Sequence, residues 1–133
     1  MIYALAIYAV FCLLFAKWNA VRIEQDKPIY HDQNAMLHSI WYGVAIFINL
    51  FTHEWFLMLA MPFVGRLFFD TALNGFRHKG LFYVSEDAKA AHYVAGSSKI
   101  DWLEYRIFKS GAKPKLLCLF ILITIITMFY ATS

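Results

Sequence analysis

Charged residues and cysteines are scarce in this 133-residue chain. Only 16% of the residues are charged, and the net charge of +3 is too small and too scattered for a nucleic-acid-binding surface. The two cysteines, Cys12 and Cys118, lie in separate apolar runs, without a CxxC pair or the Cys/His spacing of a zinc site. We therefore expect buried or lipid-facing thiols, no disulfide framework and no nucleic-acid partner.

Motifs of established chemistry are absent as well. The chain has no P-loop, no GxSxG sequence and no glycine-rich nucleotide loop. The sequence therefore favours a protein that is not an enzyme, and it predicts no cofactor.

Apolar residues are abundant instead, at 61% of the chain. Soluble domains contain about 45–50% apolar residues, and a chain of this length cannot bury so large an excess in a core surrounded by water. A bilayer is the solvent that accommodates the excess, so the composition predicts an integral membrane protein.

Four apolar segments are candidate membrane spans, at residues 2–18, 36–51, 54–76 and 116–132. A helix of sixteen residues is about 24 Å long, slightly shorter than the ~30 Å hydrocarbon thickness of a bilayer. No basic region precedes the first segment and no small-residue cleavage site follows it, so we expect a retained span rather than a signal peptide.

The basic residues indicate the orientation. With four spans, loops 20–35 and 77–115 lie on the same side of the membrane, and this side holds every lysine and arginine except Arg66. The positive-inside rule makes it the cytoplasmic side of a plasma or inner membrane, with both termini outside. At the outer turn, Thr52 is expected to cap the third span.

The loop at residues 77–115 is expected to contain one helix, at residues 99–109. Ser97 or Ser98 can cap this helix, with Asp101 three positions after Ser98. Ile100, Leu103 and Ile107 share one face, which predicts an amphipathic helix lying on the inner leaflet; the alternative is a soluble helix packed on the first loop. The fold expected is therefore all-α, with residues 1–133 forming one membrane domain, a four-helix bundle plus an interfacial helix.

A polar stripe continues out of the third span. Arg66, Asp70, Asn74 and His78 follow one another at four-residue intervals, with Arg77 beside them, and Arg66 and Asp70 are expected to form an ion pair. Measured along antiparallel helices, His38 of the second span falls at the depth of Arg66. Ionisable groups within a membrane are functional candidates. The cluster can be a structural lock between helices, a headgroup or phosphate site using Arg66, Arg77 and Asn74, or a catalytic site.

Four histidines are expected near the inner face of the membrane: His31, His38, His78 and His92. These histidines are weak candidates for metal ligands, because no two of them are spaced i, i+3 or i, i+4 as paired histidine ligands on a helix usually are. The sequence therefore predicts no metal site.

Three segments carry a family resemblance: residues 66–77, residues 83–85 and the helix region 98–108. Together they resemble small uncharacterised multi-span membrane proteins of the Bacteroidota and their phages. The resemblance implies an inner-membrane protein of unassigned activity, and it supplies no catalytic residues.

The leading functional expectation is a non-enzymatic membrane protein that serves as a subunit or assembly component of a membrane complex or homo-oligomer. Its partners would be membrane lipid and other membrane subunits or further copies of itself. One alternative is a membrane-embedded enzyme or lipid-headgroup binder with a cytoplasm-facing polar site, and a second is a pore or holin-like protein.

Overall fold

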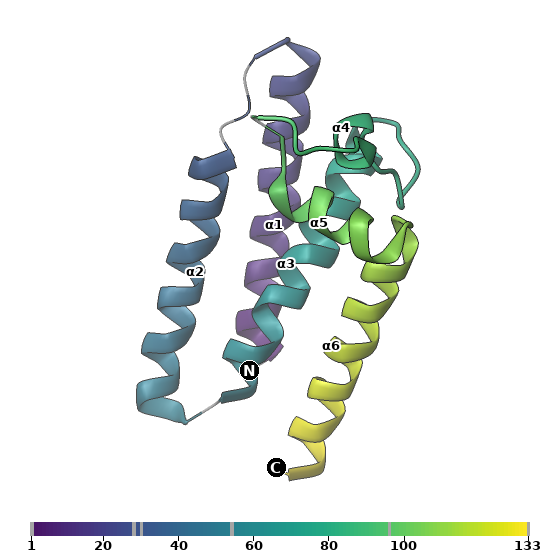
Figure 1. The fold of residues 1–133 in the computed structure, drawn as a ribbon. Helices are drawn as coiled ribbons and strands as arrows, with labels where there is room; N and C mark the ends of the chain where they lie inside the picture. The colour runs from purple at the N-terminus through teal and green to yellow at the C-terminus, as the bar shows by residue number, and fades with distance from the viewer. Residues whose placement is uncertain (1, 28, 30, 54, 96, 133) are drawn as a thin grey trace.

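The computed structural model describes residues 2–27, 29, 31–53, 55–95 and 97–132, and this part of the chain is helical with no strand (Figure 1). Its helices are α1 (Ile2–Glu24), α2 (His31–Thr52), α3 (Trp55–Phe76), α4 (Glu86–Lys89), α5 (Lys99–Phe108) and α6 (Ala112–Thr132). Four of them, α1, α2, α3 and α6, are long and apolar enough to cross a membrane. The expected all-α architecture with four candidate spans is confirmed.

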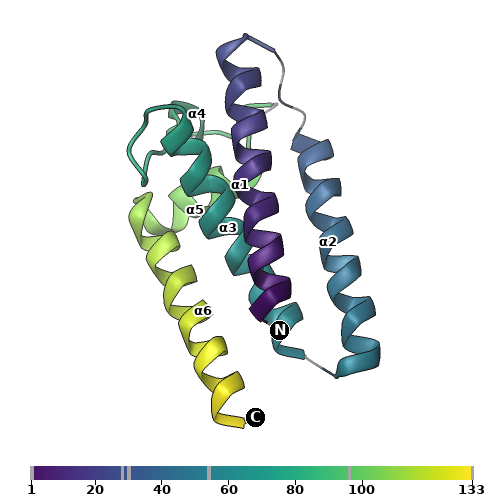
Figure 2. The ribbon, with the colours of Figure 1, turned by 180° about the vertical axis from the view of Figure 1, so that it is seen from behind.

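Helix α3 is the centre of the fold. It packs along α1, α2 and α6, with the most extensive contact against α1. Both views place α2 and α6 on opposite sides of the α1–α3 pair (Figures 1 and 2). The short helix α5 runs across the direction of the long helices, next to the first turns of α6 (Figure 1).

The core lies mainly between α1 and α3. Tyr8 and Cys12 of α1 are fully buried there, against Leu57 and Ala60 of α3. Gly65 makes this close approach possible, because a Cβ atom at that position would lie 2.6 Å from Tyr8 Oη. The helix crossing therefore requires glycine at residue 65.

Replacing Gly65 with alanine is expected to lower the free energy of unfolding by about 1–3 kcal/mol, the usual cost of overpacking a core. Gly43→Ala on α2 is the matched control, since a Cβ atom there meets no heavy atom within 4 Å. Thermal unfolding of both variants in one detergent measures the difference. Equal midpoints for the two variants would show that the α1–α3 approach is looser than described.

The turn between α2 and α3 follows directly after Thr52. Thr52 belongs to the last turn of α2, where its hydroxyl donates to the Ile48 carbonyl oxygen at 3.0 Å. His53 follows in the left-handed conformation, with φ 57°, a common way to end a helix. The predicted Thr52 cap of the third span involves residue 54, which lies outside the described residues, so it stays a prediction.

Helix α1 extends six residues beyond the apolar segment that predicted it, to Glu24. Two residues after its end, Asp26 has φ 53° and donates its backbone N–H to the Ile23 carbonyl. Hydrogen bonding and a left-handed residue, rather than the apolar boundary, decide where this helix stops. Helix α6 likewise begins at Ala112, before its apolar segment.

The segment between α3 and α6 is compact. Ser98 caps α5 as expected, its hydroxyl oxygen accepting the Asp101 backbone N–H at 3.3 Å. The sequence did not predict the single-turn helix α4, which Ser85 caps in the same way. Trp102 fastens α5 to the preceding loop by donating its ring N–H to the Ala90 carbonyl at 3.2 Å.

Candidate functional site

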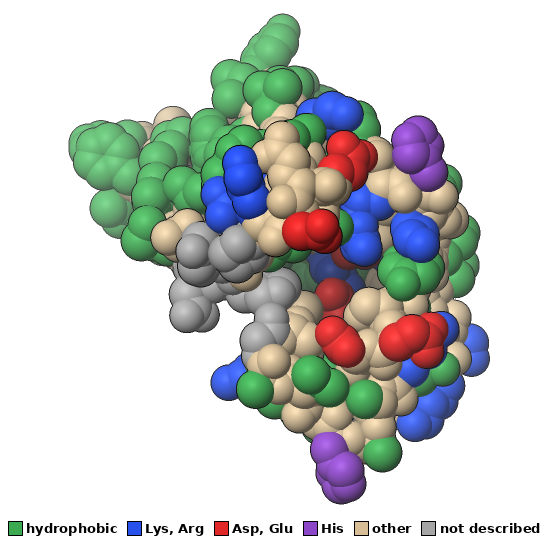
Figure 3. Space-filling view, turned by 90° about the horizontal axis from the view of Figure 1, so that it is seen from above, with side chains coloured by type: hydrophobic (Ala, Val, Ile, Leu, Met, Phe, Trp, Pro, Cys, Tyr) green, Lys and Arg blue, Asp and Glu red, His purple; other side chains and the backbone are tan. Residues whose placement is uncertain are grey.

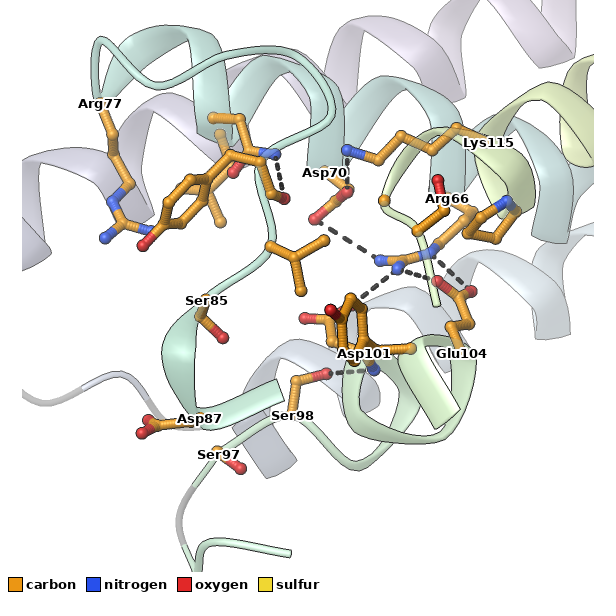
Figure 4. Close-up of a pocket in the computed structure, with 18 of the residues that line it drawn as sticks. Arg66, Asp70, Arg77, Ser85, Asp87, Ser97, Ser98, Asp101, Glu104 and Lys115 are labelled. Atoms are coloured by element: carbon orange, nitrogen blue, oxygen red, sulfur yellow. Dashed lines mark hydrogen bonds and ion pairs between the residues drawn. The ribbon is translucent and has the colours of Figure 1, made fainter. Parts of the chain in front are cut away.

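Arg66 of α3 is the centre of an ion-pair network (Figure 4). Its guanidinium lies 2.6 Å from Asp101 Oδ1 and 3.5 Å from Asp70 Oδ1. It also contacts both carboxylate oxygens of Glu104, with Nε to Oε1 at 3.0 Å. Three carboxylates thus share one guanidinium, including the bidentate geometry that favours arginine over lysine. The predicted Arg66–Asp70 pair is part of this larger network.

Lys115 extends the network to α6. Its side chain is almost fully buried, and its Nζ lies 2.6 Å from Asp70 Oδ2 and 2.6 Å from the Leu81 carbonyl oxygen. Both oxygens of Asp70 are therefore engaged, one by Arg66 and one by Lys115. The network joins α3, α5 and α6 at one level of the molecule.

Asn74, one turn further along α3, secures the loop that follows this helix. Its amide donates to the carbonyl oxygens of Leu81 and Tyr83, at 3.4 and 3.3 Å, and only 4% of the residue is exposed. Because its donors satisfy main-chain carbonyls that are otherwise costly to bury, Asn74 acts here as a structural residue.

The structure does not bring His38 to the stripe. Its Nδ1 lies 2.7 Å from Tyr8 Oη, and its ring packs against Phe11, Phe15 and Phe69. The sequence placed His38 at the same depth as Arg66, but α2 turns the His38 side chain toward aromatic residues of α1 and α3. His38 therefore stabilises helix packing.

The other candidate histidines do not converge. His78 and His92 are exposed, and the side chain of His31 is outside the described residues. Among the described residues, no group of three or more His, Cys, Asp or Glu side chains is placed to hold a metal ion.

A cavity of about 300 Å³ lies beside the network, bounded by α3, the loop after it, α5 and the start of α6. Seen from this end of the molecule, charged side chains gather around a hollow, while hydrophobic side chains cover one flank (Figure 3). Arg66, Asp70, Asn74 and Arg77 all line the cavity. Four residues of the predicted stripe therefore line a cavity, whereas His38 and His78 do not.

The cavity has two different sides (Figure 4). One side is the closed network around Arg66. On the other side lie Arg77, Ser85 and Asp87, and among the described residues neither Arg77 nor Asp87 has an ion-pair partner. This second side offers a ligand both a cation and a carboxylate without an ion-pair partner among the described residues.

No protein-family model, curated protein or solved structure matches the chain. The resemblance to Bacteroidota membrane proteins therefore stays a prediction, and the cavity is the feature of the molecule that bears most on its function.

Proposed function

We propose that the chain is a non-enzymatic integral membrane protein that holds the headgroup of a membrane lipid in the cavity beside α5. The observation that supports this most is the polar cavity itself, at one end of helices long enough to cross a membrane. Its volume of about 300 Å³ is at the lower end of the range for small-molecule sites.

The surface of α5 supports a lipid rather than a soluble ligand. Its carboxylates point inward to Arg66, whereas Ile100, Leu103 and Ile107 are 64%, 54% and 65% exposed. An apolar face turned outward is unfavourable in water and favourable at a lipid surface. We therefore propose that α5 is an interfacial helix, which lies against the bilayer beside the cavity.

The depth of α5 is compatible with this placement. Lys115 comes directly before the apolar run of α6, so we place its ion pair with Asp70 of α3 at the boundary of the hydrocarbon region. Arg66 is one helical turn deeper than Asp70, about 6 Å at 1.5 Å per residue. Interfacial helices bury their apolar faces by about 5–10 Å, so α5 held by Arg66 would lie at the expected level.

We assign the cavity to the cytoplasmic side. Seven of the twelve lysines and arginines lie in the segment between α3 and α6 or in the α1–α2 loop, and four more lie in the adjoining parts of α1 and α6: Lys17, Arg22, Lys113 and Lys115. The positive-inside rule assigns this side to the cytoplasm. Both termini lie at the opposite end from α4 and α5 (Figure 1), and in this orientation they are external.

The engagement of the charged groups argues against catalysis. Arg66, Asp70 and Glu104 are each committed to partners within the network, so none is available to exchange a proton with a substrate without breaking it. Arg66 is engaged by three carboxylates and Asn74 by two main-chain carbonyls. Both are therefore poor candidates for binding an anion, the role that the sequence suggested for them.

Native mass spectrometry of the purified protein, given a defined phospholipid mixture in detergent, tests the proposal. We expect one retained phospholipid per chain. Leu73→Trp should abolish retention because Leu73 lines the cavity, whereas Leu59→Trp should not, because Leu59 is an exposed residue of the same helix. The same spectra report self-association, which the expected homo-oligomer requires.

Two results would count against headgroup binding in the cavity. One is wild-type protein that retains no phospholipid. The other is equal retention by the wild type and Leu73→Trp, which would indicate lipid bound around the outside of the spans.

A further inference from the structure

The cavity contains hydrogen-bond donors that the protein does not use. The hydroxyl oxygens of Ser85, Ser98 and Ser110 each accept a backbone N–H at 3.2–3.3 Å. None of the three hydroxyl protons has an acceptor among the residues that the structure describes, and all three serines line the cavity. A ligand that accepts hydrogen bonds would satisfy them.

Arg77 adds a positive charge to these donors. Its guanidinium lines the same cavity on the side of Ser85 (Figure 4), and no carboxylate of the described chain pairs with it. Arg66 differs, because three carboxylates surround it. A free guanidinium together with hydroxyl donors is the usual chemistry of phosphate recognition.

Unused acceptors lie in the same cavity. Asp87 has no cationic partner within the described residues, and Asp101 uses only Oδ1 to bind Arg66. The network as a whole has two cations, Arg66 and Lys115, against three carboxylates, so one negative charge remains unbalanced. A ligand suited to this cavity therefore carries a cation as well as a phosphate.

We infer that the cavity recognises a phosphate ester bearing a primary amine, the chemistry of a phosphoethanolamine headgroup. The phosphate binds Arg77 and the hydroxyl of Ser85, and the ammonium binds Asp87, all on the same side of the cavity (Figure 4). Asp101 adds a negative charge from the network side. This inference rests on the proposed function and adds the class of headgroup.

Other common headgroups fit the lining less well. A choline group has no N–H to donate to a carboxylate and is usually bound by an aromatic cage. Among the described residues, Tyr83 and Tyr105 are the only aromatic ones that line the cavity. Glycerol and unsubstituted phosphate headgroups bring no cation to offset the negative charge of the network. Only an amine matches both the donors and the acceptors.

The test is a competition in detergent, read by native mass spectrometry. Equal amounts of phosphatidylethanolamine, phosphatidylcholine, phosphatidylglycerol and phosphatidic acid, distinguishable by mass, are added to delipidated protein. We expect retention of phosphatidylethanolamine to exceed that of each other lipid about tenfold, equivalent to ~1.4 kcal/mol. Soluble phosphoethanolamine should compete with it, because both carry the same polar groups.

Two variants separate the amine from the phosphate. Asp87→Asn should abolish the preference for phosphatidylethanolamine over phosphatidylcholine, while Arg77→Gln should weaken retention of all four lipids. The matched controls are Glu86→Gln, on the same helical turn as Asp87, and Lys79→Gln, two residues after Arg77; neither control residue lines the cavity. Both controls should behave as the wild type, and unfolding midpoints in detergent confirm that all four variants are folded.

The outcomes distinguish the two proposals. Lipid retention without a preference for the amine, or a preference that survives Asp87→Asn, overturns the headgroup assignment and leaves lipid binding intact. Absence of any retained lipid overturns the proposed function. If soluble phosphoethanolamine nevertheless binds, the amine–phosphate chemistry holds and the ligand is a free metabolite. If neither binds, both proposals are wrong.

Discussion

Replacing Arg66 by glutamine is expected to lower the free energy of unfolding by about 3–5 kcal/mol, the usual cost of removing one partner from a buried ion pair. The variant leaves Asp70, Asp101 and Glu104 close together around a neutral amide, with Lys115 as the only remaining cation of the network. Unfolding by SDS in mixed micelles measures the loss. Hydrogen exchange of residues 99–108 should rise as well, since the Arg66 network is a main attachment of α5.

Two further variants make this result specific. Adding Asp101→Asn and Glu104→Gln to Arg66→Gln should recover much of the stability, because it removes the unpaired carboxylates that cause the loss. Arg77→Gln should change stability by less than about 0.5 kcal/mol, since Arg77 has no ion pair among the described residues. If Arg66→Gln and Arg77→Gln were equally stable, the network would not hold α5 in place.

Features encoded locally were predictable from the sequence. The four apolar runs predicted the four long helices, and the Ser98 cap predicted the start of α5, because both depend on neighbouring residues. The four-residue spacing of Arg66 and Asp70 predicted their ion pair for the same reason.

The partners of Arg66 from outside its own helix were not predicted. Asp101 and Glu104 are about one helical turn apart, on a different face from the apolar residues of α5. This spacing was the only indication in the sequence that the two carboxylates could bind one cation together. On an interfacial helix such a face is expected to meet water, whereas here it turns inward to Arg66. The path of the connecting loop decides this, and residue periodicity contains no information about that path.

The placement of His38 shows a related limit. Counting residues along a helix gives the depth of a side chain but not the neighbouring helix that it faces. His38 lies at a depth compatible with Arg66 and yet bonds to Tyr8, because the wide aromatic contact of α1, α2 and α3 fixes the rotation of α2. A prediction of contacts from depth alone should therefore consider residues of every span at the same depth as possible partners.

Replacing Lys115 by methionine is the second large expected loss, about 3 kcal/mol or more. Lys115 is only 3% exposed and binds both Asp70 and the Leu81 carbonyl. Methionine keeps the apolar part of the side chain but removes the ammonium, which leaves the carbonyl with only the longer hydrogen bond from Asn74 and the network with three carboxylates for one cation. The matched control is Lys113→Met, in the same helical turn but exposed, which should change the unfolding free energy by less than about 0.5 kcal/mol.

A double-mutant cycle with Asp70→Asn shows whether this loss comes from the ion pair or from burial of the side chain. Residues in direct contact usually couple by about 0.5–3 kcal/mol, and the 2.6 Å separation of Lys115 and Asp70 predicts a value in that range. Additive effects of the two substitutions would contradict the pair and would assign the role of Lys115 to the Leu81 carbonyl alone. In that case α6 would be joined to the loop after α3 and not to the Arg66 network.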